Sequence, residues 1–425
     1  MRKCEVIFAQ ALMEVVLDSS KCVLIVATMD TKANEAMYLE ACLEEAGVPV
    51  QIMDAGIKGD SPVQVGIGRN EVAEAGGKTL AEVQGMGNEG DALGVMITGA
   101  IKCARELFGQ GRIRGVLGLG GSMGTTLGTA VMRDFPVGFP KVMISTMASR
   151  DTRPFVGTKD IFMLHSVCDI SGLNRITRRI LRNGAMAMAG MCKHAREPVP
   201  PQMPLVLIST LGTTEACVQK LRERLTAEGK EVVIFHTVGA GGKAMEEMVH
   251  EEAVSAVVDL SLHEIADHLF GGDYDAGSVR GTAALKKGLP TVLVPGNIDF
   301  LVTGPLKIAQ ERFPGRPFHT HNSAITVVRT ERQEMATLAR VIADMVNAAR
   351  GPCRILVPLG GFSAFDHREG PLHDPGAPEF FAEALRERLN ATSSLRLLPY
   401  HINDPEFADE VGHAIIELLT KVGPG

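Results

Sequence analysis

Short apolar runs rich in valine and isoleucine alternate with helix-length amphipathic stretches along most of the chain, and this alternation restricts the fold more than any other feature. Buried parallel strands produce such runs, and the helices that connect them produce the amphipathic stretches. Predicted strands of the first half are CVLIVAT (22–28), VPVQIM (48–53), ALGVMIT (92–98), RGVLGLG (114–120) and PKVMIST (140–146). Those of the second half are PLVLIST (204–210), EVVIFHT (231–237), VSAVVDL (254–260), PTVLVPG (290–296), ITVVRT (325–330) and CRILVPL (353–359). The pattern predicts an α/β protein built from doubly wound, Rossmann-like units.

One proline-rich segment interrupts the alternation. HAREPVPPQMP (194–204) carries four prolines, which lack the backbone N–H that helices and strands need. A chain of 425 residues is long enough for two or three domains, so this segment is the best boundary between them. We expect one Rossmann-like domain over residues 1–197 and a second over residues 204–425.

The two halves are similar to each other over one strand, turn and helix. Residues 23–50 align with residues 205–232 without a gap, and the alignment places Gly47 on Gly229. Duplication of an ancestral domain and convergence on one local pattern both account for this similarity. Both predict two doubly wound domains whose loops, at the carboxyl ends of the strands, border a ligand cleft between the domains.

Composition and charge exclude several classes of protein. A net charge of −7 argues against a nucleic-acid partner, because a phosphate backbone is bound through clustered lysine and arginine. The eight cysteines include no CxxC pair or zinc-like spacing, which indicates reduced thiols in a cytoplasmic protein. No uncharged apolar stretch reaches the roughly 18 residues of a transmembrane helix, so we expect no contact with a membrane.

The sharpest local motif is GLGGSMGTT (118–126), which follows a predicted strand and leads into a helical pattern. Its glycines allow the backbone to approach an anion, and the N–H groups of a helix start, helped by hydroxyls, can hold a phosphate. The motif is neither a Walker A loop nor a GxGxxG fingerprint, and tight strand–helix packing is the alternative reason for its glycines. The predicted phosphate contacts are Gly120, Gly121, Ser122, Gly124 and Thr125.

Two further loops follow strands of the same predicted sheet. TMDTK (28–32) offers a lysine to an anion, although helix capping alone explains its aspartate and second threonine. The aligned loop of the second half, TLGTT (210–214), has neither charge, and STMASRD (145–151) is a polar loop of ordinary composition. These loops add Asp30, Thr31 and Lys32 to the predicted phosphate site, and Thr146 and Ser149 to the predicted substrate contacts.

Polar clusters follow three predicted strands of the second half, in PGNIDF (295–300), FHTHNSAITVVRT (318–330) and PLGGFSAFDHREGPLHD (358–374). Turns favour glycine, asparagine and aspartate over histidine and arginine, so we expect a polar ligand site here. A helix predicted over 260–272 adds an acidic residue, but its histidines lack zincin spacing, and no metal site is expected. The predicted catalytic residues are Glu264, Asp299, His319, His321 and Asp366, and the predicted substrate contacts are Asn297, Asn322, Arg329 and Ser363.

At these residues the chain resembles a known family, the conserved bacterial proteins related to the ATP-binding amino-terminal region of the tomato mosaic virus resistance protein. The matching stretches include VATMDTKANEAMYL, GVLGLGGSMGTTL, VGFPKVMISTMASRD, VPGNIDF, HNSAITVVRT and GGFSAFD, in this order. The resemblance implies two Rossmann-like domains, ATP or a related nucleotide at the glycine-rich loop, and a homodimer. Mg²⁺ would accompany ATP if the nucleotide is hydrolysed. The resemblance supplies no reaction.

The expected function is that of a cytoplasmic nucleotide- or phosphate-binding enzyme acting on a small polar metabolite between its domains. One alternative is a binding protein that nucleotide gates without turnover. Another is a metabolic enzyme whose loop binds a sugar phosphate or a carboxylate instead of ATP. The histidine and aspartate clusters favour an enzyme, whereas the lack of a phosphoryl-transfer motif favours a binding protein.

Overall fold

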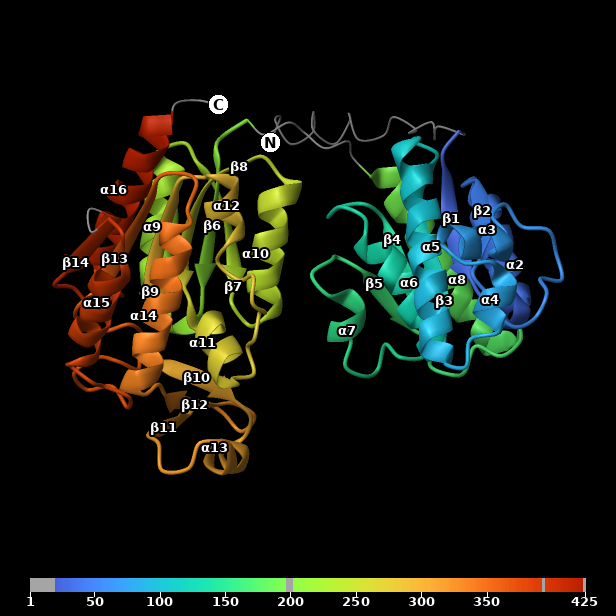
Figure 1. Cartoon of the computed structure of the whole chain (residues 1–425). Coiled ribbons are helices and arrows are strands. Elements are labelled where there is room, and N and C mark those ends of the chain that lie inside the picture. The colour runs from blue at the N-terminus through green and yellow to red at the C-terminus, as the bar shows by residue number, and fades with distance from the viewer. Residues whose placement is uncertain (1–19, 196–201, 392–393, 423–425) are drawn as a thin grey trace, which may run out of the picture. The chain divides into compact units, whose positions relative to one another are not determined.

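The computed structural model describes residues 20–195, 202–391 and 394–422, which form two compact units on either side of Pro198 (Figure 1). The middle of the proline-rich segment lies outside the described residues. Both units are parallel β-sheets covered by helices on both faces, which confirms the predicted α/β architecture.

The first unit contains a five-stranded sheet in the order β2-β1-β3-β4-β5. Its strands are β1 (Cys22–Ala27), β2 (Val50–Asp54), β3 (Ile113–Gly120), β4 (Lys141–Ser145) and β5 (Phe162–His165). Its helices are α2 (Met29–Glu45), α3 (Arg69–Ala75), α4 (Leu80–Gln84), α5 (Glu89–Gly109), α6 (Ser122–Arg133), α7 (Arg153–Val156) and α8 (Arg175–His194). Helices α2 and α8 cover one face and α3, α5 and α6 the other, so alternate β1 residues join opposite core clusters, Val23 on one side and Leu24 on the other.

The prediction of a strand at 92–98 was wrong, because this run lies within helix α5. Seven apolar residues do not distinguish a buried strand from a buried helix segment. The longer context favours the helix: Asn88 caps its start and Glu89 lies in its first turn. Buried residues then recur at helical spacing, at Ala92, Met96 and Ala100.

The second unit contains a six-stranded parallel sheet in the order β14-β13-β9-β8-β6-β7. Its strands are β6 (Leu205–Thr210), β7 (Glu231–His236), β8 (Val254–Ser261), β9 (Thr291–Gly296), β13 (Cys353–Pro358) and β14 (Leu395–Leu398). Its helices are η2 (Gly212–Thr214), α9 (Glu215–Ala227), α10 (Ala240–Glu251), α11 (His263–Phe270), α12 (Ala283–Lys287), α13 (Leu306–Arg312), α14 (Arg332–Asn347), α15 (Ala377–Arg388) and α16 (Pro405–Val422). Helices α9 and α16 pack on one face, and α14 and α15 on the other.

A small antiparallel sheet follows β9 and consists of β10 (Phe300–Thr303), β11 (Phe318–Thr320) and β12 (Thr326–Arg329) in the order β10-β12-β11. The apolar run 325–330 therefore forms an antiparallel strand and does not extend the parallel sheet. Phe300 and Val327 of this sheet pack against Leu211, which follows β6. The small sheet thus covers part of the carboxyl edge of the large one.

The backbone supports the alignment of the two halves. Lys32 interrupts helix α2 with φ −126° and ψ 17°, and its aligned partner Thr214 has φ −122° and ψ 16°. Gly47 and Gly229, which follow the aligned helices, have φ of +72° and +71°. The strand, the kink and the turn after the helix therefore correspond in the two units.

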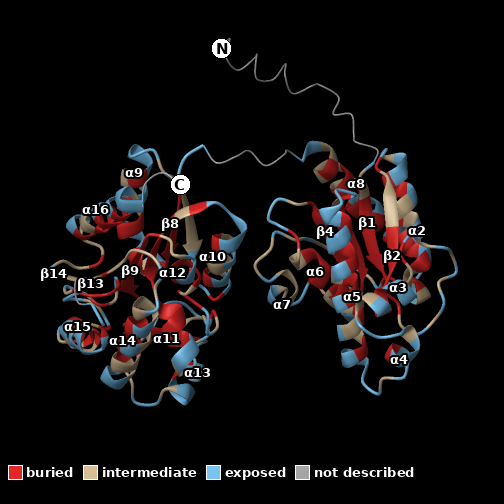
Figure 2. Cartoon of the chain, turned by 45° about the horizontal axis from the view of Figure 1, so that its top comes forward, coloured by how far each residue is buried: buried red, intermediate tan, exposed pale blue. Residues whose placement is uncertain are grey.

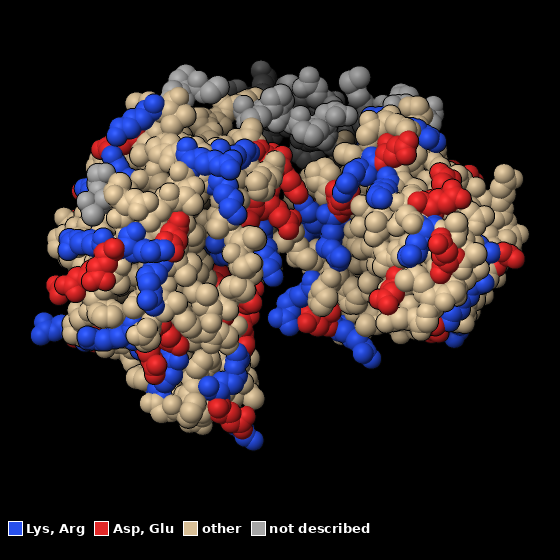
Figure 3. Space-filling model, in the orientation of Figure 1, with Lys and Arg blue, Asp and Glu red and all other residues tan. Residues whose placement is uncertain are grey.

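Burial and charge are distributed as in ordinary globular domains. The central strands β1, β3, β6 and β8 are among the most deeply buried elements, whereas the edge strands β5 and β7 contain no buried residue (Figure 2). Positive and negative side chains are interspersed over the visible face, and neither sign covers a whole unit (Figure 3). The described cysteines are free thiols. Among the described residues, no helix is long and apolar enough to cross a membrane.

Candidate functional site

A pocket of about 660 Å³ lies in the first unit at the carboxyl ends of β1 and β3. The order of the strands reverses here, because β2 lies on one side of β1 and β3 lies on the other. The loops that leave two such strands diverge and open a crevice, which is where doubly wound sheets bind ligands. The loop after β1, the loop after β2, the start of α5 and the glycine-rich loop after β3 all line the pocket.

Two glycines of the glycine-rich loop are required by the local structure. Gly120 has φ +153°, and a Cβ atom there would lie 2.9 Å from the Cα atom of Gly124. A Cβ atom at Gly124 would lie 2.8 Å from the carbonyl oxygen of Leu119. These two glycines therefore permit tight packing of β3 against α6. At Gly121 the nearest atom to a Cβ atom would be the Thr146 Oγ1 at 3.8 Å, so neither packing nor backbone conformation requires glycine at this position.

The positive end of helix α6 faces this pocket. Gly121 is the N-cap, and the first turn of the helix contains no acidic residue to offset the helix dipole. Ser122 and Gly124 line the pocket, and the first backbone N–H groups of a helix have no partner within the helix. Thr125 is buried below the loop instead, where its hydroxyl lies 2.6 Å from the Ser145 hydroxyl. The structure thus brings the other predicted residues of this loop, but not Thr125, to the pocket.

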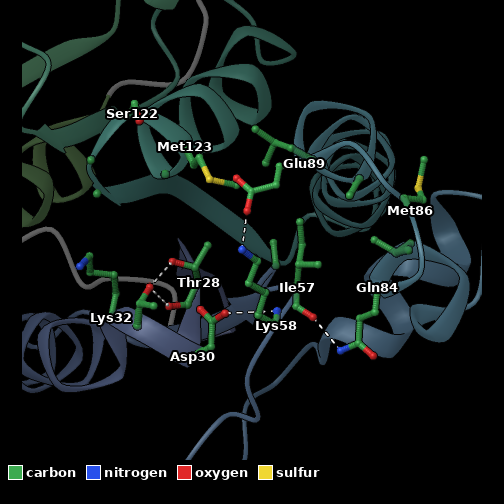
Figure 4. Close-up of a pocket in the computed structure, with 18 residues that line it drawn as sticks. Thr28, Asp30, Lys32, Ile57, Lys58, Gln84, Met86, Glu89, Ser122 and Met123 are labelled. Atoms are coloured by element: carbon green, nitrogen blue, oxygen red, sulfur yellow. Dashed lines mark hydrogen bonds and ion pairs between the residues drawn. The ribbon is translucent and has the colours of Figure 1, made fainter.

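The first turn of α2, which follows β1 directly, supplies the opposite wall (Figure 4). Its Asp30 carboxylate accepts hydrogen bonds from the backbone N–H groups of Lys58 and Gly59, each at 3.3 Å. Helix capping, the alternative explanation for Asp30, does not describe this geometry, because Asp54 accepts the first N–H of α2, that of Met29, at 3.0 Å. Thr31 and Lys32 also line the pocket.

Several pocket residues escaped sequence reasoning, and most of them lie outside the motifs that the sequence offers. Lys58 lies in the loop after β2, and its ammonium group pairs with the carboxylate of Glu89 at the start of α5. This contact raises the pKa of Lys58 and lowers the pKa of Glu89, so both groups are charged at neutral pH. The remaining additional lining residues are mostly apolar: Ala55, Ile57, Val83, Gln84, Met86, Ala92, Leu93 and Met123.

Thr146 and Ser149 lie in the loop after β4 and are not among the residues that line the pocket. The backbone N–H of Thr146 donates to the carbonyl oxygen of Gly120 at 3.2 Å, so this loop supports the glycine-rich loop from behind. Their role as substrate contacts stays a prediction.

In the second unit, the structure gathers four of the predicted residues into one buried cluster. The Ser363 hydroxyl donates to the carboxylate of Asp299 at 2.7 Å. A guanidinium nitrogen of Arg329 lies 3.3 Å from the Asp366 carboxylate and 3.7 Å from that of Asp299. Burial, and secondly the charge of Asp366, raises the pKa of Asp299 to about 7. The cluster therefore combines a positive group with a carboxyl group able to exchange a proton near neutral pH.

Two other predicted residues of this unit are fully buried and already hydrogen-bonded. The Asn297 side chain donates to the Ser261 hydroxyl at 2.7 Å. The Glu264 carboxylate accepts from the backbone N–H of Gly239 at 2.7 Å and from Arg280 at 2.6 Å. These contacts give both side chains a structural role, and a catalytic or ligand-binding role stays a prediction.

The predicted residues of the segment around β11 lie further out. The His319 ring packs 4.9 Å from the ring of Phe365, measured between centroids, and the His321 ring lies 6.4 Å from it. His321 and Asn322 are exposed, and the Asn322 side chain accepts a backbone N–H within its own turn. Among the described residues, no group of three or more histidine, cysteine, aspartate or glutamate side chains is placed to hold a metal ion.

The solved structures to which the chain is similar include the UDP-GlcNAc 2-epimerase from Methanocaldococcus jannaschii. That match has 12% sequence identity and a TM-score of 0.21, and it covers 94% of this chain and 99% of that chain. Sequence relatives are far more similar. A UPF0261 protein of Clostridium tetani (strain Massachusetts / E88) is 34% identical over 403 residues, which are 95% of this chain and 100% of the relative.

The ToMV resistance protein Tm-1(GCR237) of Solanum lycopersicum is 34% identical over 354 residues, which are 81% of this chain but 47% of the tomato protein. Models of an uncharacterised protein family, UPF0261, match both halves of the chain. The N-terminal domain model matches residues 21–197, and the C-terminal domain model matches residues 203–419. These matches confirm the resemblance that the motifs indicated, and the chain belongs to the UPF0261 family.

Proposed function

We propose that the first unit binds a phosphate-bearing ligand, a nucleotide such as ATP, in the pocket between the loops after β1 and β3. One observation carries the proposal: the start of α6, with no acidic residue in its first turn, opens onto a pocket that also contains two lysines. Backbone N–H groups at a helix start, lysine ammonium groups and hydroxyls together form a common anion site.

The rest of the pocket suits the less polar part of such a ligand. Ile57, Val83, Met86 and Leu93 add apolar side chains to the lining of the pocket, and none of them belongs to the glycine-rich motif. Flat, weakly polar groups such as a nucleobase gain by leaving water in this kind of environment. The pocket volume also lies within the range of roughly 300–1,000 Å³ that is typical of small-molecule sites.

A magnesium ion would be held mainly by the phosphates of the ligand. Mg²⁺ in nucleotide sites commonly takes one or two protein carboxylates together with phosphate oxygens and water. Of the two carboxylates in this pocket, Asp30 accepts two backbone N–H groups and Glu89 pairs with Lys58. Asp30, which keeps one oxygen outside these two bonds, is the better candidate for a direct ligand.

For the second unit, we propose the buried cluster of Asp299, Asp366, Arg329 and Ser363 as the group that acts on a small polar metabolite. A carboxyl group with a pKa near 7 can donate or accept a proton, and arginine can hold a carboxylate of the substrate. A nucleotide-gated binding protein without turnover remains the alternative. The free thiols among the described cysteines support a cytoplasmic location, and the family resemblance supports a homodimer.

Calorimetric titration with ATP, ADP, ribose 5-phosphate and adenosine tests the proposal. We expect ATP or ADP to bind most tightly, and a ligand at 100 times its Kd to stabilise the first unit by about 2.7 kcal/mol. Gly121→Val places a branched side chain at the N-cap of α6, beside the N–H groups that we propose hold the phosphate, and should abolish binding with little loss of stability. Gly212→Val is the matched control, because a Cβ atom at Gly212 in the second unit meets no atom within 4 Å. Tighter binding of ribose 5-phosphate would favour a sugar phosphate, and binding unchanged by Gly121→Val would refute the site.

A further inference from the structure

The ion pair between Lys58 and Glu89 lies at the pocket that we assign to the ligand. Both residues line the pocket, and Figure 4 shows the Lys58 side chain extended towards Glu89, with Met123 of α6 close by. Both side chains remain largely exposed, at 76% for Lys58 and 66% for Glu89. An exposed pair of this kind adds little stability to a fold, so the fold alone does not explain the contact.

The backbone at Lys58 is held independently of this ion pair. The Asp30 carboxylate accepts the N–H groups of Lys58 and Gly59, and the Asp54 carboxylate accepts that of Gly56 at 2.8 Å. Lys58 can therefore exchange the partner of its ammonium group by rotating its side chain, without moving the loop.

Glu89 is likewise held without Lys58. It is the first residue of helix α5, whose start is capped by Asn88, and a carboxylate there interacts favourably with the helix dipole. Loss of the lysine therefore leaves Glu89 in a favourable position. Because other contacts hold the backbone of Lys58 and the position of Glu89, Lys58 can move from Glu89 to another partner at little cost in free energy.

We propose that Lys58 is a phosphate-binding residue and that Glu89 competes with the ligand for it. This inference rests on the proposed function of the pocket. A phosphate group carries up to two negative charges and three acceptor oxygens, so it outcompetes a single carboxylate for the ammonium group. In the absence of ligand, the Lys58 ammonium group pairs with the Glu89 carboxylate, and the net charge of the pocket stays close to zero.

A double-mutant cycle tests this competition, with ADP as the probe and Kd as the readout. Lys58→Met should weaken ADP binding about tenfold or more, since it removes a charged hydrogen bond. Glu89→Gln should tighten binding severalfold in the wild-type background. In the Lys58→Met background, Glu89→Gln should change Kd by less than half of that factor, because there is no lysine left to release.

The outcomes separate the inference from the proposed function. If ADP binds the wild type but the two substitutions act independently, the competition is refuted while the ligand site stands. If Lys58→Met leaves the ADP affinity unchanged, Lys58 is not a phosphate contact. Failure of the wild type to bind ADP, ATP or a sugar phosphate refutes both. Lys102→Met is the control for removing one exposed charge, because Lys102 lies on α5 but does not line the pocket.

Discussion

In both units, corresponding segments follow the strands at which the strand order reverses. In the first unit this place is an open pocket, whereas in the second it is filled by buried side chains. In the first sheet Val26 pairs with Gly118, and in the second the aligned residue Ile208 pairs with Val258. Gly118–Gly124 therefore corresponds to Val258–Glu264 in position. The first segment lines a pocket, whereas the second is a buried part of its unit.

The two segments hold the same place in their sheets, so the difference between an open and a filled site comes from their side chains. Ser261 stands where the first unit has Gly121, and Glu264 stands where it has Gly124. The Ser261 hydroxyl lies 3.1 Å from the Nδ1 atom of His263, and Glu264 points to Arg280. A doubly wound sheet provides the place for a ligand, and a few small residues decide whether that place stays open.

The largest expected effect comes from removing the arginine at the centre of the filled region. Arg280 is fully buried and pairs with Asp259, Glu264 and Glu246. Arg280→Met leaves two buried carboxyl groups and the partly buried carboxyl group of Glu246 without their cation, and should reduce the free energy of unfolding by about 3–5 kcal/mol. Denaturant titration measures this loss, and the exposed Arg340→Met serves as control. A loss below about 1 kcal/mol would show that the filled region contributes little to stability.

The second prediction concerns the pH dependence of the second unit. Asp299 releases its proton near pH 4 in the unfolded chain but holds it to about pH 7 when folded. Between these values the native state binds more protons, so stability should fall as pH rises, by at most about 1.4 kcal/mol per pH unit. Asp299→Asn should flatten this slope in unfolding experiments between pH 4 and 7. An equally steep slope in the variant would mean that other groups cause it.

A third experiment transfers one residue of the filled region into the open one. Gly121→Ser places in the first unit the residue that the second unit has at Ser261. A hydroxymethyl group at the N-cap of α6 should weaken nucleotide binding about fivefold, or roughly 1 kcal/mol, while the melting temperature changes little. Calorimetry and thermal unfolding measure the two quantities. If affinity stays constant, side-chain size at this position does not distinguish the two units.

The smallest expected effect comes from the aligned helical positions that follow β1 and β6, Lys32 and Thr214. Lys32→Thr introduces the residue type found at Thr214 and removes one pocket cation. Affinity for ADP should fall about twofold to threefold, and its dependence on salt should weaken, because solvent screens the charge of the partly exposed Lys32. Titrations at low and high salt measure both. An effect larger than that of Lys58→Met would move the main phosphate contact to Lys32.

Sequence patterns identified the residues on one side of the candidate pocket but missed the charged residues on the other side. The glycine-rich loop and the loop after β1 carry residues whose chemistry is visible without structure, and the fold brings them to one pocket. Lys58 and Glu89 look like ordinary surface charges in sequence. The start of α5, which carries Glu89, was also missed, because residues 92–98 of this helix were predicted to form a strand.

In the second unit, the sequence was a better guide to which polar residues belong to the site than to whether they are buried or exposed. Asp299 and Arg329 are distant in sequence and do meet, since β10 and β12 pair and Phe300, the neighbour of Asp299, lies opposite Arg329. His321 was grouped with them, yet it is exposed, in the turn that follows the edge strand β11. Local pattern does not determine on which side of an inserted sheet a side chain lies.

The bond from Asp30 to the loop after β2 has a consequence for how the family can diversify. The carboxylate holds backbone N–H groups, which every residue except proline provides, so the loop keeps its place whatever side chain stands at position 58. At position 58 the backbone N–H thus anchors the loop, whereas the side chain determines which ligand is recognised. A relative can exchange Lys58 for a shorter, neutral or aromatic side chain and acquire a new ligand preference in one substitution, with the scaffold of the pocket unchanged.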